Sequence, residues 1–322
     1  MSNVETRQLH SLGGDRSHAP RQPRYTEVTI NPIPLRLFPA NTMLDLHCHS
    51  TQSDGSLTPT QLVQEAIAAG LKVLSITDHD TLSGWDEAYQ AAAGTSLTLV
   101  PGVELSTVHN GRSLHILGFY PNRQALEAPL RERVEGRHRR AQQMAENLAA
   151  LGYPIILPRL SDTMAPGRPH IAAALVAAGY VRSPQEAFER WLGEDKPAHV
   201  AYEKFSAVDG IQLLRRCGAV PVWAHPYLFR GGPVPEVLPT LVEAGLMGLE
   251  VYHPNHAERD RRRLAAIGQQ YGLLTTGGSD YHGPSPHGSG LNQLQLSLDL
   301  LPPLQQGARS LHADQGLDFH LN

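Results

Sequence analysis

The chain has 322 residues, of which 41% are hydrophobic and 18% charged, and 27 Lys+Arg against 31 Asp+Glu leave a formal charge of −4 at pH 7. A chain of this length and composition can bury a sizeable core, which excludes a wholly disordered protein. Its slight net negative charge argues against a large surface that binds nucleic acid. No apolar run approaches the roughly 18 residues of a membrane span, and the two cysteines are too few for a disulfide framework and favour a reducing, cytoplasmic setting.

The first half of the chain alternates short apolar runs with amphipathic segments. Residues 1–42 are rich in proline and glycine and carry no secretory signal, so we expect a leader that is disordered or weakly packed. The pattern then predicts strands at 43–47, 72–77, 97–103 and 113–120, and helices at 58–70 and 83–93. Thr58 is expected to cap the first helix, with Pro59 in its first turn. Apolar strands that alternate with amphipathic helices predict a parallel sheet covered on both faces.

Residues 126–204 do not continue this alternation of strands and helices. They are predicted to form a helical insertion that caps the substrate site. A long polar helix is expected at 129–151, followed by helices at 167–179 and 184–192. The long helix carries five arginines: Arg131, Arg133, Arg137, Arg139 and Arg140. Such a run usually forms a solvated helix face, with phosphate binding as the alternative.

The strand–helix pattern resumes in the last part of the chain. Helices are expected at 207–217, 234–244 and 257–271, and strands at 219–224, 247–252 and 273–277. The pattern therefore predicts an α/β fold with seven strands, built from residues 43–125 and 205–300 and followed by a C-terminal tail at 301–322. It leaves open whether the strands close into a barrel.

The chain has 17 histidines, and many follow predicted strands together with carboxylates. Eight polar residues lie at or near the carboxyl ends of strands: His47, His49, Asp54, His79, Glu104, His225, Asp280 and His282. His115 lies within a strand. The carboxyl ends of strands in a parallel barrel share one mouth, so we expect these nine side chains to converge. Four histidines in the leader and tail, His10, His18, His312 and His320, are expected to have no role.

The alternation of side chains along a strand sorts the residues of the first motif. His47 and His49 share one face, so Cys48 points to the other side and is expected to be a small buried hydrophobe. Asp45 shares the face of His47. It is either an acceptor for an imidazole N–H or a buried structural carboxylate.

The donor types predict a site for several cations. Imidazole and carboxylate suit Mn, Fe, Zn or Mg, and six histidines with three carboxylates exceed the ligands of one ion, so two or three are expected. Each histidine alone is more often a hydrogen-bonded loop residue, but nine converging groups favour metal. Three divalent ions would leave a positive surplus that attracts a phosphate dianion, and such ions lower the pKa of water to about 7. Glu104 is the expected bridge between two ions.

Seven short motifs in order resemble the PHP family, the metal-dependent phosphoesterases named for the polymerase and histidinol phosphatase domain. They are DLHCHS (45–50), SDG (53–55), TDHD (77–80), PGVE (101–104), HILG (115–118), AHP (224–226) and GSDYH (278–282). The resemblance implies a distorted seven-stranded β/α barrel with a trinuclear Mn, Fe or Zn site. It assigns His47, His49, Glu104 and Asp280 to one ion, Glu104, His115 and His225 to a second, and Asp54, His79 and His282 to a third. Glu104, His225 and Asp280 are the residues predicted to have a catalytic role.

A further motif, GRPHIA (167–172) in the helical insertion, resembles the branch that acts on nucleoside 3′,5′-bisphosphates. By this resemblance Arg168 and His170 bind substrate phosphate. Alternatively, Arg168 only anchors the insertion to the barrel. His253, just after the strand expected at 247–252, is a further candidate for a substrate contact.

These motifs predict hydrolysis of the 3′-phosphate of a nucleoside 3′,5′-bisphosphate, such as 3′-phosphoadenosine 5′-phosphate, by a hydroxide that the ions activate. Three alternatives remain: a 5′-to-3′ exonuclease on short RNA or DNA, a histidinol-phosphate-type phosphatase, and a metal-binding accessory module without turnover. The expected partners are a small nucleotide or a short oligonucleotide, two or three divalent ions, most simply Mn, no membrane and no obligate protein.

Overall fold

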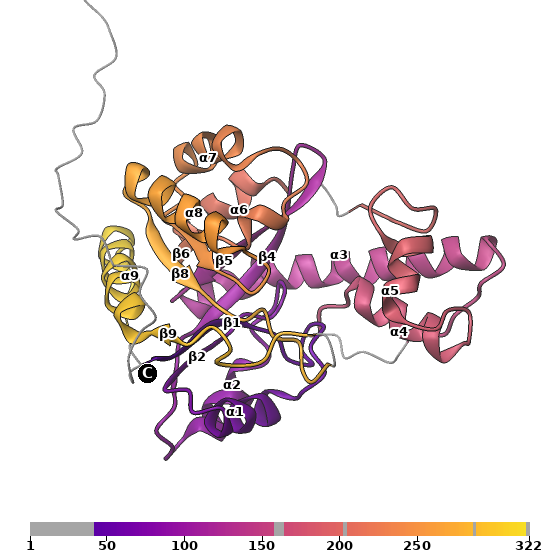
Figure 1. Ribbon diagram of the computed structural model, residues 1–322, viewed down its shortest axis with the longest axis horizontal. Helices are drawn as coiled ribbons and strands as arrows, with labels where there is room; N and C mark the ends of the chain where they lie inside the picture. The colour runs from indigo at the N-terminus through magenta and orange to yellow at the C-terminus, as the bar shows by residue number, and fades with distance from the viewer. Residues whose placement is uncertain (1–41, 158–163, 202–204, 286–287, 320–322) are drawn as a thin grey trace, which may run out of the picture. The chain divides into compact units, whose positions relative to one another are not determined.

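Two β-sheets carry the residues that the motifs single out. The computed structural model describes residues 42–157, 164–201, 205–285 and 288–319 (Figure 1). Apart from its last residue, the predicted leader lies outside the described residues, as do His10, His18 and His320. In the described part, the strand orders are β3-β2-β1-β9 in one sheet and β4-β5-β6-β7-β8 in the other. The strands are β1 (Thr42–Cys48), β2 (Val73–Ile76), β3 (Thr98–Leu99), β4 (Gly102–His109), β5 (Arg112–Phe119), β6 (Val220–Trp223), β7 (Gly248–Tyr252), β8 (Leu274–Gly277) and β9 (Leu296–Ser297).

Apart from α9, which was not predicted, the helices lie close to the predicted positions. They are α1 (Pro59–Ala68), α2 (Trp85–Ala92), α3 (Arg123–Ala150), α4 (Arg168–Ala177), α5 (Pro184–Ala187), α6 (Ala207–Arg216), α7 (Val234–Glu243), α8 (Glu258–Tyr271) and α9 (Leu301–Gln315). Three short turns accompany them: η1 (Phe188–Leu192), η2 (Pro226–Leu228) and η3 (Leu298–Leu300). The predicted cap of α1 is confirmed, because the Thr58 side chain accepts a hydrogen bond from the backbone of Gln61 and Pro59 is the first helical residue.

Helix α3 begins six residues before the predicted start. The polar run predicts a helix that begins at Pro129. Instead the Asn122 side chain accepts the N–H of Ala125 and caps the helix there, and Pro129 lies inside it. The cap therefore outweighs the single backbone hydrogen bond that Pro129 cannot donate.

The α/β class is confirmed, but the all-parallel arrangement is wrong on both sides of β5 in the second sheet, and β9 also pairs antiparallel with β1 in the first. Strands β4 and β5 pair antiparallel, as do β5 and β6, whereas β6, β7 and β8 are parallel. Asn110 and Gly111 connect β4 to β5 with positive φ angles of 50° and 73°. Asn-Gly is the strongest short hairpin signal because both residues tolerate this backbone region. The sequence carried this signal, and the alternating pattern obscured it.

A closed seven-stranded barrel is not confirmed, because the described residues form nine strands in two sheets. The predicted strand 97–103 is divided into β3 and β4 at Pro101, which has no N–H to donate to a ladder. The two sheets adjoin through isolated bridges, Cys48 to Tyr281 and His79 to Glu104. Both bridges lie beside residues of the histidine motifs, so these junctions position the candidate ligands.

Helix α3 contributes to two apolar clusters. Leu126 and Leu130, in its first half, pack in the core under the second sheet. Met144 and Leu148, in its second half, pack with residues of α4 and η1. The helix thereby connects the helical segment 164–201 to the sheets (Figure 1). None of the described helices combines the length and apolarity that crossing a membrane requires.

The segment read as a C-terminal tail includes helix α9. Leu304, Ala308 and Leu311 pack in one apolar cluster with residues of β1 and β6. His312, expected to have no role, is 4% exposed, and its Nε2 lies 2.8 Å from the carbonyl oxygen of Tyr120. That expectation was wrong, because His312 ties α9 to the end of β5.

Candidate metal centre

The structure brings all nine predicted side chains together around Glu104. Its Oε2 lies 3.3 Å from His47 Nε2, 3.2 Å from His49 Nε2 and 3.2 Å from His79 Nδ1. Its Oε1 lies 2.9 Å from His115 Nδ1 and 3.2 Å from His225 Nε2. A carboxylate that is 1% exposed thus faces five imidazoles from four separate segments of the chain.

Two further carboxylates complete the cluster. Asp280 Oδ1 lies 3.4 Å from His47 Nε2 and 3.3 Å from His49 Nε2. Asp54 Oδ1 lies 3.3 Å from His282 Nε2, and its Oδ2 lies 3.8 Å from His79 Nε2. The backbone is left-handed at His225 and Asp280, with φ of 34° and 52°. Such strain in non-glycine residues is typical of functional sites.

The side chains of β1 point to alternate faces as predicted, but the role of one of them differs from the prediction. Cys48 points away from the imidazoles, is fully buried, and its thiol donates to the Ser75 carbonyl at 3.2 Å. Asp45 Oδ1 accepts the backbone N–H groups of His47 and Ser279, so its interpretation as the acceptor for the His47 imidazole is wrong. Burial raises the pKa of Asp45 to about 6, as for a structural carboxylate.

The carboxylate that does hold the His47 imidazole is Glu250 in β7, which the motifs did not include. Its Oε1 lies 2.9 Å from His47 Nδ1. The signal that could have identified it is a lone carboxylate in the apolar strand 248–252, where an unpaired charge would be costly.

The ligand atoms fall into three overlapping groups, within each of which they lie within 4.8 Å of one another. These groups are His47, His49 and Asp280; His79, Glu104 and His115; and His49, Asp54, His79 and His282. The first and third resemble the sets that the family implies. The second group contains His79 instead of the expected His225, although His225 Nε2 also lies 3.2 Å from Glu104 Oε1.

The donor set fits divalent cations. His47 Nε2, His49 Nε2, His79 Nδ1 and Asp54 Oδ1 are buried without a hydrogen-bond partner. Leaving several buried polar atoms unpaired in one place is costly unless something binds them. Nitrogen and carboxylate oxygen donors without thiolate are the ligands of Mn, Fe, Zn or Mg. The donors of the nine side chains therefore fit more than one such ion.

The charges within the cluster are strongly coupled. Burial lowers the pKa of His47, but Glu250, Glu104 and Asp280 raise it well above its usual value. Burial raises the pKa of Glu104, but His79, His115 and His47 hold it well below its usual range. For His79 burial dominates, and its pKa falls to about 3. A cation would replace protons as the partner of these carboxylates, so metal binding is expected to release protons.

A second polar network joins the cluster to α3 through Asp80, the residue after His79. Its carboxylate accepts hydrogen bonds from Arg133 Nε and Arg137 Nε, both at 2.7 Å, while Arg140 donates to the Val200 carbonyl at 2.6 Å. Arg137 is 2% exposed. The interpretation of the arginine run as a solvated face is therefore wrong for these three residues. Arg131 and Arg139 are exposed as expected.

The candidate substrate residues lie in different surroundings. Arg168 Nη1 lies 3.4 Å from the Leu192 carbonyl, and its guanidinium faces the ring of Phe188. Both contacts lie within the helical segment, so they match neither a phosphate contact nor an anchor to the sheets. His170 Nδ1 accepts the N–H of Gly167 at 3.0 Å and so helps to cap α4. A Cβ on Gly167 would lie 3.2 Å from Asp54, so the start of α4 adjoins the cluster. His253 Nε2 lies 3.4 Å from Asp280 Oδ2.

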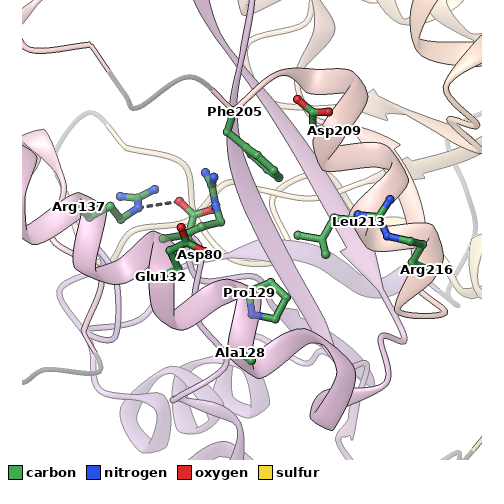
Figure 2. Close-up of a pocket in the computed structure, with 11 residues that line it drawn as sticks. Asp80, Ala128, Pro129, Glu132, Arg137, Phe205, Asp209, Leu213 and Arg216 are labelled. Carbon is green, nitrogen blue, oxygen red and sulfur yellow. Dashed lines mark hydrogen bonds and ion pairs between the residues drawn. The ribbon is translucent and has the colours of Figure 1, made fainter.

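A cavity of about 610 Å³ lies between α3 and α6, with Asp80 and Arg137 in its wall (Figure 2). Its other lining residues are Ala128, Pro129, Glu132, Arg133, Gly136, Phe205, Asp209, Leu213 and Arg216. None of the nine clustered residues lines it. The cavity thus adjoins the network of Asp80 and not the cluster itself.

Comparison with known proteins gives consistent findings. The family model of the PHP domain matches residues 45–154. The chain is 35% identical over 264 residues to a 5′-3′ exoribonuclease of Haemophilus influenzae, covering 80% of this chain and 94% of that protein. It is 32% identical over 269 residues to the 3′,5′-nucleoside bisphosphate phosphatase of Chromobacterium violaceum, covering 81% and 93%. A crystal structure from Bifidobacterium adolescentis, described as a metal-dependent phosphoesterase, has a TM-score of 0.76 at 33% identity, covering 84% of this chain and 98% of that one.

Proposed function

Because the chain belongs to the PHP family and is a phosphoric ester hydrolase, we propose that it removes the 3′-phosphate from nucleoside 3′,5′-bisphosphates. The observation that carries this proposal is the contact of one buried carboxylate, Glu104, with five imidazoles. The phosphatase of Chromobacterium violaceum supports the choice of substrate class.

Two or three divalent ions are proposed to occupy the cluster, with Mn as the first choice and Fe, Zn or Mg as alternatives. The proposed ligands are His47, His49, Asp54, His79, Glu104, His115, His225, Asp280 and His282. When bound, the ions would lower the pKa of a water molecule toward neutrality and offset the charge of the phosphate. We assign the catalytic role to Glu104, His225 and Asp280: His225 Nε2 lies 3.2 Å from Glu104 Oε1, and Asp280 Oδ1 lies 3.4 Å from His47 Nε2.

The substrate is proposed to approach from the start of α4. The N–H groups of a helix start and its dipole favour an anion. Gly167 has no side chain, which lets the start of α4 come close to Asp54. His170, Arg168 and the buried His253 are the proposed contacts to the substrate, and residues 126–204 are the proposed cap over it. Arg168 would have to leave Phe188 to reach a phosphate, so among the three it has the least geometric support.

A second activity, 5′-to-3′ exonuclease cleavage of short oligonucleotides, is favoured by the relative in Haemophilus influenzae. Both reactions break a phosphate ester and would use the same nine side chains. They differ in the group that leaves, so analysis of products separates them.

The test is incubation of the purified, Mn-loaded chain with three substrates: 3′-phosphoadenosine 5′-phosphate, a 5′-phosphorylated RNA tetranucleotide and histidinol phosphate. We expect inorganic phosphate and adenosine 5′-phosphate from the first. Mononucleotides from the second would establish the exonuclease activity, and faster turnover of the third would replace the nucleotide proposal. A metal-replete protein that releases phosphate from none of them would overturn the proposal, and the Glu104→Gln variant serves as the control for contaminating hydrolases.

A further inference from the structure

We propose that Glu250 is a positioning residue that sets the tautomer of His47 and the backbone position of His225, so that one carboxylate aligns two of the proposed metal ligands. This inference rests on the proposed metal centre, but not on the identity of the substrate. Glu250 itself does not face the ligand atoms of the cluster, and it acts through the two histidines.

The geometry that carries the proposal is a carboxylate with both oxygens engaged. Glu250 is fully buried in β7. Its Oε1 lies 2.9 Å from His47 Nδ1, and its Oε2 accepts the backbone N–H of His225 at 2.8 Å. These partners come from β1 and from the end of β6, so Glu250 connects the two sheets at the cluster.

The contact with His47 selects one tautomer of its ring. A carboxylate can only accept, so the Nδ1 that faces it carries the proton. In the neutral ring the lone pair is then on Nε2, the atom that faces Glu104 and Asp280 and has no hydrogen-bond partner. Only this tautomer can donate Nε2 to a cation. A carboxylate behind a ligand histidine is a known means of fixing the ring and raising its basicity.

The contact with His225 holds an unfavourable backbone. A non-glycine residue with φ of 34° is strained, and such strain persists only where surrounding contacts compensate for it. The hydrogen bond to Glu250 Oε2 holds this peptide, and the His225 side chain then lies with Nε2 3.2 Å from Glu104 Oε1. Both histidines that Glu250 holds therefore contact Glu104.

The decisive experiment compares Glu250→Gln with Asp45→Asn. Glutamine has one oxygen and one NH₂ group, whereas both partners of Glu250 donate, so the amide can serve only one of them. If the oxygen takes the His225 N–H, the NH₂ group faces His47 Nδ1 and moves the ring proton to Nε2. If the oxygen takes His47, the His225 N–H loses its acceptor.

Asp45→Asn is the matched control. Asp45 is also a buried carboxylate beside His47, and the substitution removes the same charge. Its two hydrogen bonds from the backbone, from the N–H groups of His47 and Ser279, end on the single oxygen Oδ1, so an asparagine can keep them. Loss of charge alone would affect both variants, whereas loss of positioning would affect only Glu250→Gln.

The measurement is the affinity for Mn²⁺ and Zn²⁺, by equilibrium dialysis with metal analysis, in the full chain without substrate. We expect Glu250→Gln to bind about 10- to 100-fold more weakly, Glu250→Asp to fall between it and the wild type, and Asp45→Asn to stay within about threefold. In the Zn-loaded wild type, ¹⁵N spectra of labelled histidine should show His47 with its proton on Nδ1.

Three results would overturn the inference: unchanged metal affinity in Glu250→Gln, equal losses in the Gln and Asn variants, or a Zn-loaded His47 protonated on Nε2. If Glu250→Gln does not fold, the spectrum of the wild type and the affinity of Glu250→Asp still decide. Failure to hydrolyse nucleoside bisphosphates would refute the proposed substrate and would leave these readouts unaffected.

Discussion

Replacing Arg137 by methionine tests the buried network that joins α3 to the candidate metal centre. Arg137 Nε lies 2.7 Å from Asp80 Oδ2, Nη2 donates to Ser106 Oγ at 2.6 Å, and Nη1 donates to the Pro166 carbonyl at 3.2 Å. The substitution keeps most of the side-chain volume and removes the charge and these donors. Three segments of the chain lose a common partner.

The expected cost follows from burial. Removing one partner of a buried ion pair costs about 3–5 kcal/mol, because the other charge stays buried without compensation. Asp80 is fully buried, but Arg133 still lies 2.7 Å from its Oδ1. We therefore expect the lower end, a loss of about 3 kcal/mol in the free energy of unfolding.

Urea denaturation at pH 7, followed by circular dichroism, measures this loss. The control is Arg131→Met, an exposed arginine of the same helix, which should change the free energy of unfolding by less than about 0.5 kcal/mol. Asp80→Asn should cost less in the Arg137→Met background than in the wild type, because the two residues share one interaction. A loss below about 1 kcal/mol for Arg137→Met, or full additivity with Asp80→Asn, would refute the reasoning.

Three further predictions concern the cluster and its supports. Glu104→Gln should reduce turnover by at least about 100-fold. It should also remove most of the rise in melting temperature that Mn²⁺ gives the wild type, as measured by differential scanning fluorimetry. An equal rise in the variant and the wild type would contradict the place of Glu104 among the ligands. Burial raises the pKa of Asp80, but Arg133 and Arg137 hold it below its usual range. Ionised Asp80 therefore stabilises the fold above a pH of about 4, and this contribution is lost as the pH falls through the folded-state pKa. The difference in urea midpoint between the wild type and Asp80→Asn should narrow from pH 7 to pH 3, and a wider difference at pH 3 would contradict a lowered pKa of Asp80. Gly278→Ala should destabilise the fold and weaken metal binding, because its Cβ would overlap the backbone and Cβ of His47, whereas Gly290→Ala meets nothing within 4 Å and should be silent in the same thermal and metal-binding assays.

Local signals accounted for much of the fold. The hydrogen bonds of a helix cap and the alternation of a strand involve residues a few positions apart, so Thr58 at α1 and the shared face of His47 and His49 could be predicted. The hairpin at Asn110 was also encoded locally. It was missed because the strand–helix pattern on either side favoured parallel pairing, and two residues decide the direction of two strands.

By itself, the sequence determined the kind of chemistry: which donors the chain offers, in which order, and at which strand ends they stand. Tertiary structure decided what surrounds them. His47 and Glu250 are 203 positions apart, and Asp80 and Arg137 are 57 apart. An acidic residue in a strand, or an arginine on a helix, reads the same whether it meets water or a buried partner. Only the packing of β7 against β1, and of α3 against the loop after β2, determines which carboxylate orients a histidine and which arginine leaves the solvent.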